Sequence, residues 1–305
     1  MKRFIFYCAV FLLPVFIVVL GLEFLLRHIP NDYSYKSTYL DENSDKIQTL
    51  FLGSSHAFYD IDPQYLQRFS FNAAHVSQTL DLDYEILLKY KNNYSNLKNI
   101  VVPVSYFSLF EQLGKTEEFW RLKNYLIYYN IHTTNRIKDY SELLSHTLEI
   151  NIERLDKYYF HGKDEISCST LGFGLKHNSK DNKDLIISGP ETAKRHTYND
   201  LSLYAENLQI LSQIIEFAKE RHIRVIVFTP PAFNTYVKNL DTNQLNITIK
   251  AMLGLDEKYN NCVYLNMLTN STFTAIDFYD SDHLNEIGAK KFTIKMDGVI
   301  SKYWK

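Results

Sequence analysis

Cysteine is scarce in this chain of 305 residues: there are three, with no Cys-x-x-Cys pair and no Cys/His cluster. A cysteine-ligated metal centre is therefore not expected. A charge excess is also lacking, because the net charge is -2, so the sequence predicts no nucleic-acid or other polyanionic partner. Glycine is low at 10 residues, whereas Tyr (23) and Phe (20) are abundant. That aromatic content suits a glycan-facing surface or ordinary packing equally well.

Charge is missing altogether from one long run near the N-terminus, Phe4 to Leu22. As a helix, this run would span roughly 28 Å, which is enough to cross a bilayer. No small-x-small exit site follows, so the run predicts an uncleaved signal anchor within residues 1–27. Lys2 and Arg3 precede it, and the positive-inside rule then places the chain after Arg27 outside the cytoplasm. The expected location is the cell membrane, crossed once, with the main domain in the periplasm or cell exterior.

Two cysteines, Cys168 and Cys262, lie in the part predicted to be extracytoplasmic. In an oxidising compartment they could form a disulfide. Two unpaired buried cysteines explain the sequence as well, so both alternatives stay open.

Short apolar runs alternate with helical patterns through residues 47–305, after a polar segment at 28–46 that we interpret as a stalk. The runs that read as buried strands are Ile47–Gly53, Phe69–Asn72, Asn99–Val104, Ile223–Phe228 and Cys262–Leu265. The helical patterns lie at Leu80–Tyr90, Leu201–Glu220, Gln244–Tyr259 and from Leu284 onward. This alternation predicts an α/β domain with three layers, α/β/α, around a central parallel sheet.

One stretch, at about 111–200, interrupts the alternation and is predicted to be an insertion. It contains helical segments rich in Tyr and Leu, at Phe119–Tyr129 and Tyr140–Tyr159, and then a polar loop at about 174–184. We expect the insertion to cap the edge of the sheet at the carboxyl ends of its strands, where open α/β folds bind ligands.

A first candidate for chemistry is Leu50–Pro63, an apolar run that breaks into Gly53-Ser54-Ser55-His56. Gly53 suits a tight turn at the end of a strand. A serine just beyond such a turn projects from the rim of the sheet and becomes a nucleophile if a base removes its proton.

A second candidate is Phe278–Gly288, which contains Asp280 three residues before His283 and lies just ahead of the last helical pattern. This spacing lets the carboxylate of Asp280 reach back to the imidazole of His283 and fix its tautomer. Asp282 is adjacent to the histidine and is predicted instead to be the N-cap of the last helix. Each motif alone is weak evidence, but together they suggest a Ser-His-Asp system.

The pair of motifs resembles the SGNH (GDSL-like) hydrolase superfamily, from Ile47 to the C-terminus apart from the insertion. The Gly53-Ser54-Ser55-His56 block matches the family's nucleophile block, and Asp280 with His283 matches its C-terminal block. The resemblance implies an SGNH/flavodoxin-like fold in which Ser55 is the nucleophile, His283 the base and Asp280 its orienting partner.

The middle blocks of the family are less well matched. Ala74 stands where the family has a glycine whose backbone N–H holds the oxyanion. Ser105 follows the strand at Asn99–Val104, where the family brings an asparagine. The implied oxyanion donors are therefore the N–H groups of Ser55 and Ala74, with Ser105 in place of the asparagine.

The predicted anchor makes the chain similar to a membrane-anchored subgroup. That subgroup includes the extracytoplasmic protein of lipoteichoic-acid D-alanylation and exopolysaccharide O-acetyltransferases. The implied function is acyl-ester transfer or hydrolysis on a cell-surface glycan or polymer, with a multi-spanning membrane acyltransferase as a donor partner. The missing asparagine favours an alternative, a non-catalytic binding or assembly protein for cell-envelope polymer modification.

A metal centre is the remaining chemical alternative. His56 and His75 lie near the proposed site in sequence, and with Asp280 and His283 they could offer ligands. No pair of them has the spacing of ligands on one helix, and a serine enzyme needs no metal. The sequence therefore predicts neither a metal nor another cofactor.

Overall fold

The computed structural model describes residues 1–302, except for the side chains of Ile5, Cys8 and Ala9. The chain divides into two compact units. The helical unit comprises Met1–Ser37 and Phe119–Ile166, and the sheet unit comprises Thr38–Glu118 and the chain from Ser167 onward. The stretch that we interpreted as one insertion therefore contributes to both units.

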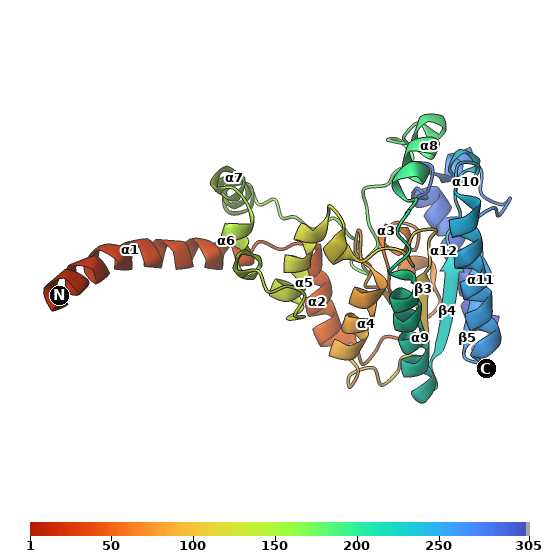
Figure 1. The fold of residues 1–305 in the computed structure, drawn as a ribbon, viewed down its shortest axis with the longest axis horizontal. Helices are drawn as coiled ribbons and strands as arrows, with labels where there is room; N and C mark the ends of the chain where they lie inside the picture. The colour runs from red at the N-terminus through yellow and green to blue at the C-terminus, as the bar shows by residue number, and fades with distance from the viewer. Residues whose placement is uncertain (303–305) are drawn as a thin grey trace. The chain divides into compact units, whose positions relative to one another are not determined.

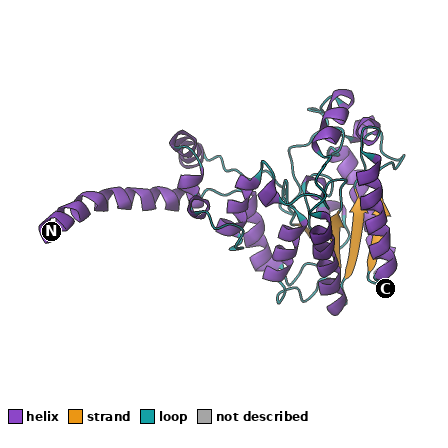
Figure 2. Ribbon diagram, in the orientation of Figure 1, coloured by secondary structure: helices purple, strands orange, loops and turns teal. Residues whose placement is uncertain are grey.

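A five-stranded parallel sheet forms the centre of the sheet unit (Figure 2). Its strands are β1 (Thr49–Phe51), β2 (Ser70–Asn72), β3 (Asn99–Pro103), β4 (Arg224–Thr229) and β5 (Cys262–Asn266). The spatial order β2-β1-β3-β4-β5 is the doubly wound arrangement in which the ligand crevice lies at the carboxyl ends of β1 and β3. The predicted α/β fold class with a central parallel sheet is confirmed.

Helices flank this sheet, as Figures 1 and 2 show. They are α3 (Ser55–Phe58), α4 (Leu80–Lys89), α8 (Leu185–Arg195), α9 (Tyr204–Glu220), α10 (Asn234–Val237), α11 (Thr242–Lys258) and α12 (Glu286–Lys302). Short 3-10 turns add Pro63–Tyr65, Leu113–Lys115 and Ala275–Asp277.

The core of the sheet unit forms because parallel strands buried on both faces present apolar side chains to helices. α12 contributes Phe292 and Met296 to one buried cluster. From the sheet, this cluster takes Phe51, Val101 and Phe228. α9 packs against β4 and against α4, and α11 packs against β5.

The segment interpreted as a stalk is mostly helical, as α2 (Asp32–Asn43), and this is a correction. Its composition is polar, yet Tyr33, Lys36, Ser37 and Leu40 recur at helical spacing and are all buried. Its first half belongs to the helical unit, where Ser37 Oγ donates to the carbonyl of Tyr128 at 2.8 Å.

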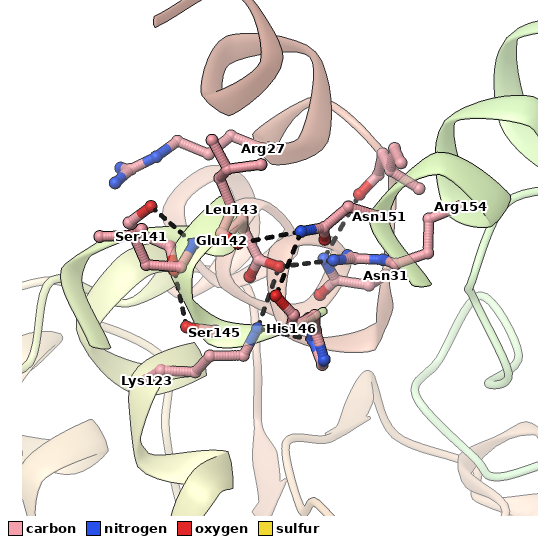
Figure 3. Close-up of polar contacts among 12 residues, drawn as sticks. Arg27, Asn31, Lys123, Ser141, Glu142, Leu143, Ser145, His146, Asn151 and Arg154 are labelled. Atoms are coloured by element: carbon pink, nitrogen blue, oxygen red, sulfur yellow. Dashed lines mark hydrogen bonds and ion pairs between the residues drawn. The ribbon is translucent and has the colours of Figure 1, made fainter. Parts of the chain in front are cut away.

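The helical unit combines α1 (Lys2–Arg27) with α5 (Leu122–Tyr128), α6 (Glu142–Ser145) and α7 (Leu148–Tyr159). Two 3-10 turns, Phe119–Arg121 and Ile137–Tyr140, complete it. Within α1, the segment Val10–Arg27 is long and apolar enough to cross a membrane. Figure 3 shows the polar contacts beside its C-terminal end.

The two cysteines of the sheet unit, Cys168 and Cys262, are both buried thiols rather than a disulfide. Burial raises the pKa of Cys262 to about 12, so this thiol is unreactive at neutral pH. Of the two alternatives left open by the sequence, the structure has the pair of thiols.

Candidate active site

The candidate nucleophile follows a strained turn at the end of β1. Gly53 has a φ of +108°, and a Cβ added there would lie 2.4 Å from ring carbons of Pro103. Only glycine fits this position without a shift of the neighbouring chain. The turn brings Ser55 to the first position of α3, at the carboxyl end of β1.

The structure brings Ser55 together with Asp280 and His283. Nε2 of His283 lies 2.8 Å from Oγ of Ser55. Nδ1 of the same ring lies 3.0 Å from Oδ1 of Asp280, which also accepts the backbone N–H of His283 at 2.9 Å. Asp280 therefore fixes both the loop and the tautomer, and the imidazole can exchange a proton with the serine hydroxyl.

Asp282 does not cap the last helix, which corrects our interpretation of this residue. Asn285 caps α12 instead, since its side-chain oxygen accepts two backbone N–H groups of the first turn, at 3.0 and 3.1 Å. Asp282 is buried, and its carboxylate lies 3.5 Å from His56, 3.6 Å from His283 and 3.9 Å from His196, measured to ring nitrogens.

This buried carboxylate is ionised because imidazoles surround it. Burial raises the pKa of Asp282, but His283, His56 and His196 outweigh burial and hold it well below its usual value. Neither carboxylate oxygen has a hydrogen-bond partner among the described residues. The charge is therefore available to act on the neighbouring rings.

The pKa of His283 is set by these carboxylates. Burial lowers it, but the charges of Asp280 and Asp282 and the hydrogen bond from Asp280 outweigh burial and raise the pKa to about 10. His283 can act as a base only in its neutral form. The electrostatics therefore favour the imidazolium and place the reactive form at alkaline pH.

His56 is neutral, because burial lowers its pKa against the opposing effect of Asp282. Nδ1 of His56 lies 2.9 Å from Oγ of Ser105, and Nε2 faces Asp282. An N–H on Nε2 is the favourable choice beside an anion, so Nδ1 accepts the proton of Ser105.

His56, Asp282 and His283 also have the composition of a metal site. A metal ion must lie in the plane of each imidazole that binds it, because the nitrogen lone pair lies in that plane. The rings of His56 and His283 are stacked instead, with centroids 4.6 Å apart and planes 13° from parallel. Two stacked rings cannot direct their lone pairs at one ion, so the described residues do not fit a metal here.

The two predicted oxyanion donors beyond Ser55 have other partners. The backbone N–H of Ala74 donates to the side-chain oxygen of Asn72 at 3.1 Å. The hydroxyl of Ser105 donates its hydrogen bond to Nδ1 of His56 at 2.9 Å, which leaves no hydroxyl proton for an oxyanion. The backbone N–H groups of Ser55 and His56 in the first turn of α3 have no acceptor within the described part of the chain. They are the better placed donors for an oxyanion.

Two histidines of the site were missed by sequence reasoning, His177 and His196. His177 is sandwiched between Tyr59 and Tyr279, with ring centroids 3.5 and 3.9 Å apart, and lies edge-on to His283 at 5.1 Å. Burial lowers the pKa of His177 to about 2, and burial likewise lowers the pKa of His196 to about 3. Both lie in the predicted insertion, and no spacing pattern marks them.

The polar loop at 174–184 is fastened over the Asp-x-x-His motif within the sheet unit. The backbone N–H of Lys183 donates to the carbonyl of Tyr279 at 2.6 Å. Ser179 donates to the carboxylate of Glu286 from its backbone at 2.7 Å and from its hydroxyl at 2.6 Å. The loop therefore belongs to the wall of the site.

Two buried carboxyls tie the nucleophile turn to its surroundings. Asp60 accepts the backbone N–H of Leu284 at 2.9 Å, and burial raises its pKa well above the usual value. Asp83 accepts the N–H of Gly53 at 2.7 Å. Asp83 also lines a very small cavity, of about 10 Å³, beside the turn, together with Ser54 and Glu111.

A larger hollow, of about 250 Å³, lies in the helical unit and contains no residue of the Ser-His-Asp arrangement. It is lined by Phe119, Trp120, Lys123, Lys138, Asp139, Ser145 and His146. The larger hollow and the Ser-His-Asp arrangement therefore lie in different parts of the chain.

No family model and no curated protein matches the chain. Among solved structures, a provisionally described acylhydrolase from Bacteroides fragilis matches at 11% identity, covering 88% of this chain and 96% of that one, with a TM-score of 0.43. A provisionally described platelet activating factor from Streptococcus pneumoniae matches at 12% identity, covering 97% and 98%, with a TM-score of 0.42. Likenesses this distant carry no argument about function.

Proposed function

We propose that the chain is an extracytoplasmic acyl-ester enzyme of the SGNH type, anchored in the membrane by α1. The single observation that carries the proposal is the continuous contact from Ser55 Oγ through His283 to Asp280, at 2.8 and 3.0 Å. It joins two motifs from opposite ends of the sheet unit at the carboxyl end of β1, where doubly wound folds bind ligands.

The reaction would run through an acyl-enzyme. Oγ of Ser55 bonds to the acyl carbon while its proton moves to Nε2 of His283. The oxyanion accepts from the N–H groups of Ser55 and His56, and its collapse expels the alcohol, which takes the proton from His283. Water or a glycan hydroxyl then gives a proton to His283 and attacks the acyl carbon. Collapse of this second intermediate releases the product acid or ester and expels Oγ of Ser55, which takes the proton back from His283. Asp280 keeps the ring oriented throughout.

The proposed setting is the outer face of the cell membrane. Lys2 and Arg3 precede the apolar part of α1, which supports an outward orientation of the chain after Arg27. An acyl ester of a cell-surface glycan or polymer is the proposed substrate class. A multi-spanning membrane acyltransferase is the proposed donor partner if the reaction is a transfer.

A second candidate function is a non-catalytic protein that binds or assembles cell-envelope polymer. Two observations favour it. The predicted donors Ala74 and Ser105 both have partners inside the protein. The raised pKa of His283 also disfavours the neutral base at pH 7.

A serine-reactive fluorophosphonate separates the two candidates. For an enzyme we expect covalent labelling of the full-length protein at alkaline pH, lost in Ser55→Ala and retained in the matched control Ser54→Ala. Ser54 is the adjacent serine. It is buried, and its side-chain hydroxyl has no hydrogen-bond partner among the described residues. A folded wild-type protein that takes no label from pH 7 to 10 would favour the binding protein.

A further inference from the structure

The short helix α6 is held at the C-terminal end of α1 by one half-buried set of contacts. Glu23 of α1 accepts the hydroxyl of Ser141 at 2.6 Å and the backbone N–H groups of Glu142 and Leu143 at 3.1 and 2.9 Å. A carboxylate at the start of a helix satisfies N–H groups that have no helical partner. Arg27 adds a hydrogen bond to the carbonyl of Tyr140. These contacts fix α6 beside the last turn of α1.

The next helix, α7, packs through two polar side chains, Asn151 and Arg154. Glu142, which is buried, binds Lys123 at 3.0 Å and Arg154 of α7 at 2.8 Å. Arg154 also binds Glu165 at 2.8 Å, and Asn151 is buried with its amide on the carbonyl of Leu143. Asn151 and Arg154 therefore lie on the side of α7 that packs, whereas its other charged residues, at positions 149, 153, 156 and 157, are exposed.

The apolar side of α7 points outward. Leu148, Ile152, Leu155 and Tyr159 recur at steps of four, three and four, which places them on one stripe of the helix, with Leu155 half-buried at its inner edge. Leu148 is 62% exposed, Ile152 56% and the following Phe160 81%. Large apolar side chains exposed together on one helix mark a surface that contacts something other than water.

This stripe continues onto α1. Tyr159, at its end, donates a hydrogen bond to the carbonyl of Leu25 at 3.0 Å. Leu25 and Phe24 lie in the segment that can cross a membrane, and their side chains are exposed. The exposed side of α7 and the exposed end of α1 therefore form one apolar surface.

We propose that this surface, the outer side of α7 with Leu144 and Phe160, lies in the interface of the bilayer that α1 crosses. The inference rests on the proposed membrane anchor and not on the chemistry at Ser55. Acidic side chains flank the stripe at Glu149, Glu153 and Asp156, with Lys157 as the exposed basic residue. The attraction is therefore apolar and does not require anionic lipid. The helical unit is held flat on the membrane rather than swinging from α1.

A fluorescence test uses the full-length chain in phospholipid nanodiscs of phosphatidylcholine. The Cys8→Ser background leaves the two buried cysteines, and NBD is attached at Ile152→Cys, at the matched control Glu153→Cys, or at Val15→Cys within α1. Interfacial helices bury their apolar side roughly 5–10 Å into the headgroup boundary, so nitroxide lipids labelled near the top of the acyl chain are the quenchers.

We expect blue-shifted, quenched NBD at position 152 and unquenched NBD at 153, because the two side chains lie about 100° apart around the helix. Quenching at 15 shows that α1 is inserted. Equal quenching at 152 and 153 with insertion of α1 would overturn the proposal while leaving the anchor in place. Loss of quenching at 15 would overturn the proposal together with the anchor. Because the quencher is on the lipid and the discs contain no native partner of this chain, quenching at 152 assigns the surface to lipid rather than to a partner protein.

Discussion

The imidazole ring of His56 lies flat on that of His283, with centroids 4.6 Å apart and planes 13° from parallel. His56 is neutral and therefore offers an aromatic face to a ring that becomes positively charged when it takes the serine proton. Asp282 lies beside both rings, at 3.5 and 3.6 Å. In the proposed reaction, the residue after Ser55 and the residue before His283 would thus both stabilise the imidazolium.

A first prediction concerns the pH dependence of turnover in Asp282→Asn. His283 must be neutral to accept the proton, so kcat/KM should rise as pH rises through its raised pKa. Removing the charge of Asp282 lowers that pKa, so the acidic limb of the profile should move to lower pH. The measurement is kcat/KM for an activated acetyl ester between pH 6 and 11.

The control for this prediction is Asp280→Asn, which removes the carboxylate that orients the ring. Its plateau turnover should fall by about 10⁴, as expected for a triad that loses its tautomer control. An Asp282→Asn profile superimposable on that of the wild type would show that the buried charge does not act on His283.

A second prediction tests what Ser105 does. If Ser105 is an oxyanion donor, Ser105→Ala should lower turnover by about 10²-fold, whichever residue stands at position 56. The 2.9 Å contact with His56 predicts a different result: the effects of Ser105→Ala and His56→Gln should not add. A double-mutant cycle on kcat should give a coupling of about 0.5–3 kcal/mol. Additive losses would restore Ser105 to the oxyanion site.

The five strands could be predicted closely from the sequence because a parallel sheet buries both faces, so each strand reads as a short apolar run. The helix α2 could not, because Tyr33, Lys36 and Ser37 are buried through contacts with other parts of the chain rather than through their hydrophobicity. The alternation of apolar runs and helical patterns therefore predicts the sequence of strands and helices along the chain. It does not predict a helix such as α2, which is stabilised by tertiary contacts.

In the site, the motifs at Ser55 and His283 could be predicted because their spacing is local. His177 and His196 could not, since a single histidine in a loop has no periodic signal and reaches the site only through the fold. The prediction that Asp282 caps the last helix was wrong because Asn285, three residues later, provides the cap. Asp282 is instead buried beside His56 and His283, and a short sequence motif does not show which of its residues are buried.

A third prediction tests the strained turn before the nucleophile. Gly53→Ala places a Cβ 2.4 Å from Pro103 at a φ of +108°, so we expect a loss of about 1–3 kcal/mol of stability and reduced labelling of Ser55. Gly254→Ala is the matched control. It lies within α11 with no atom within 4 Å of the added Cβ, and should gain about 0.5–1 kcal/mol. Urea unfolding measures both, and equal effects would mean that the turn carries no strain.

A fourth prediction concerns stability rather than turnover and depends on Asp83. Burial raises the pKa of this carboxyl to about 7, against hydrogen bonds from Gln78 and from the N–H of Gly53. Its second oxygen has no hydrogen-bond partner among the described residues and suits a retained proton. A carboxyl whose folded pKa is raised gives stability that is complete below the unfolded pKa of about 4 and is lost as pH rises through about 7.

Asp83→Asn keeps an acceptor for the N–H of Gly53 and cannot ionise. The variant should therefore not show the loss of stability with rising pH that the ionisation of Asp83 causes. Relative to the wild type, its free energy of unfolding should therefore be higher at pH 8 than at pH 5, by about 1.4 kcal/mol for each pH unit between 5 and the folded pKa of about 7. Comparing the two pH values cancels any constant cost of the amide. Asp41→Asn, which removes the same charge from an exposed position, is the control and should show no such difference. If Asp83→Asn differs from the wild type equally at both pH values, the carboxyl under the nucleophile turn is ionised in the folded protein throughout this range.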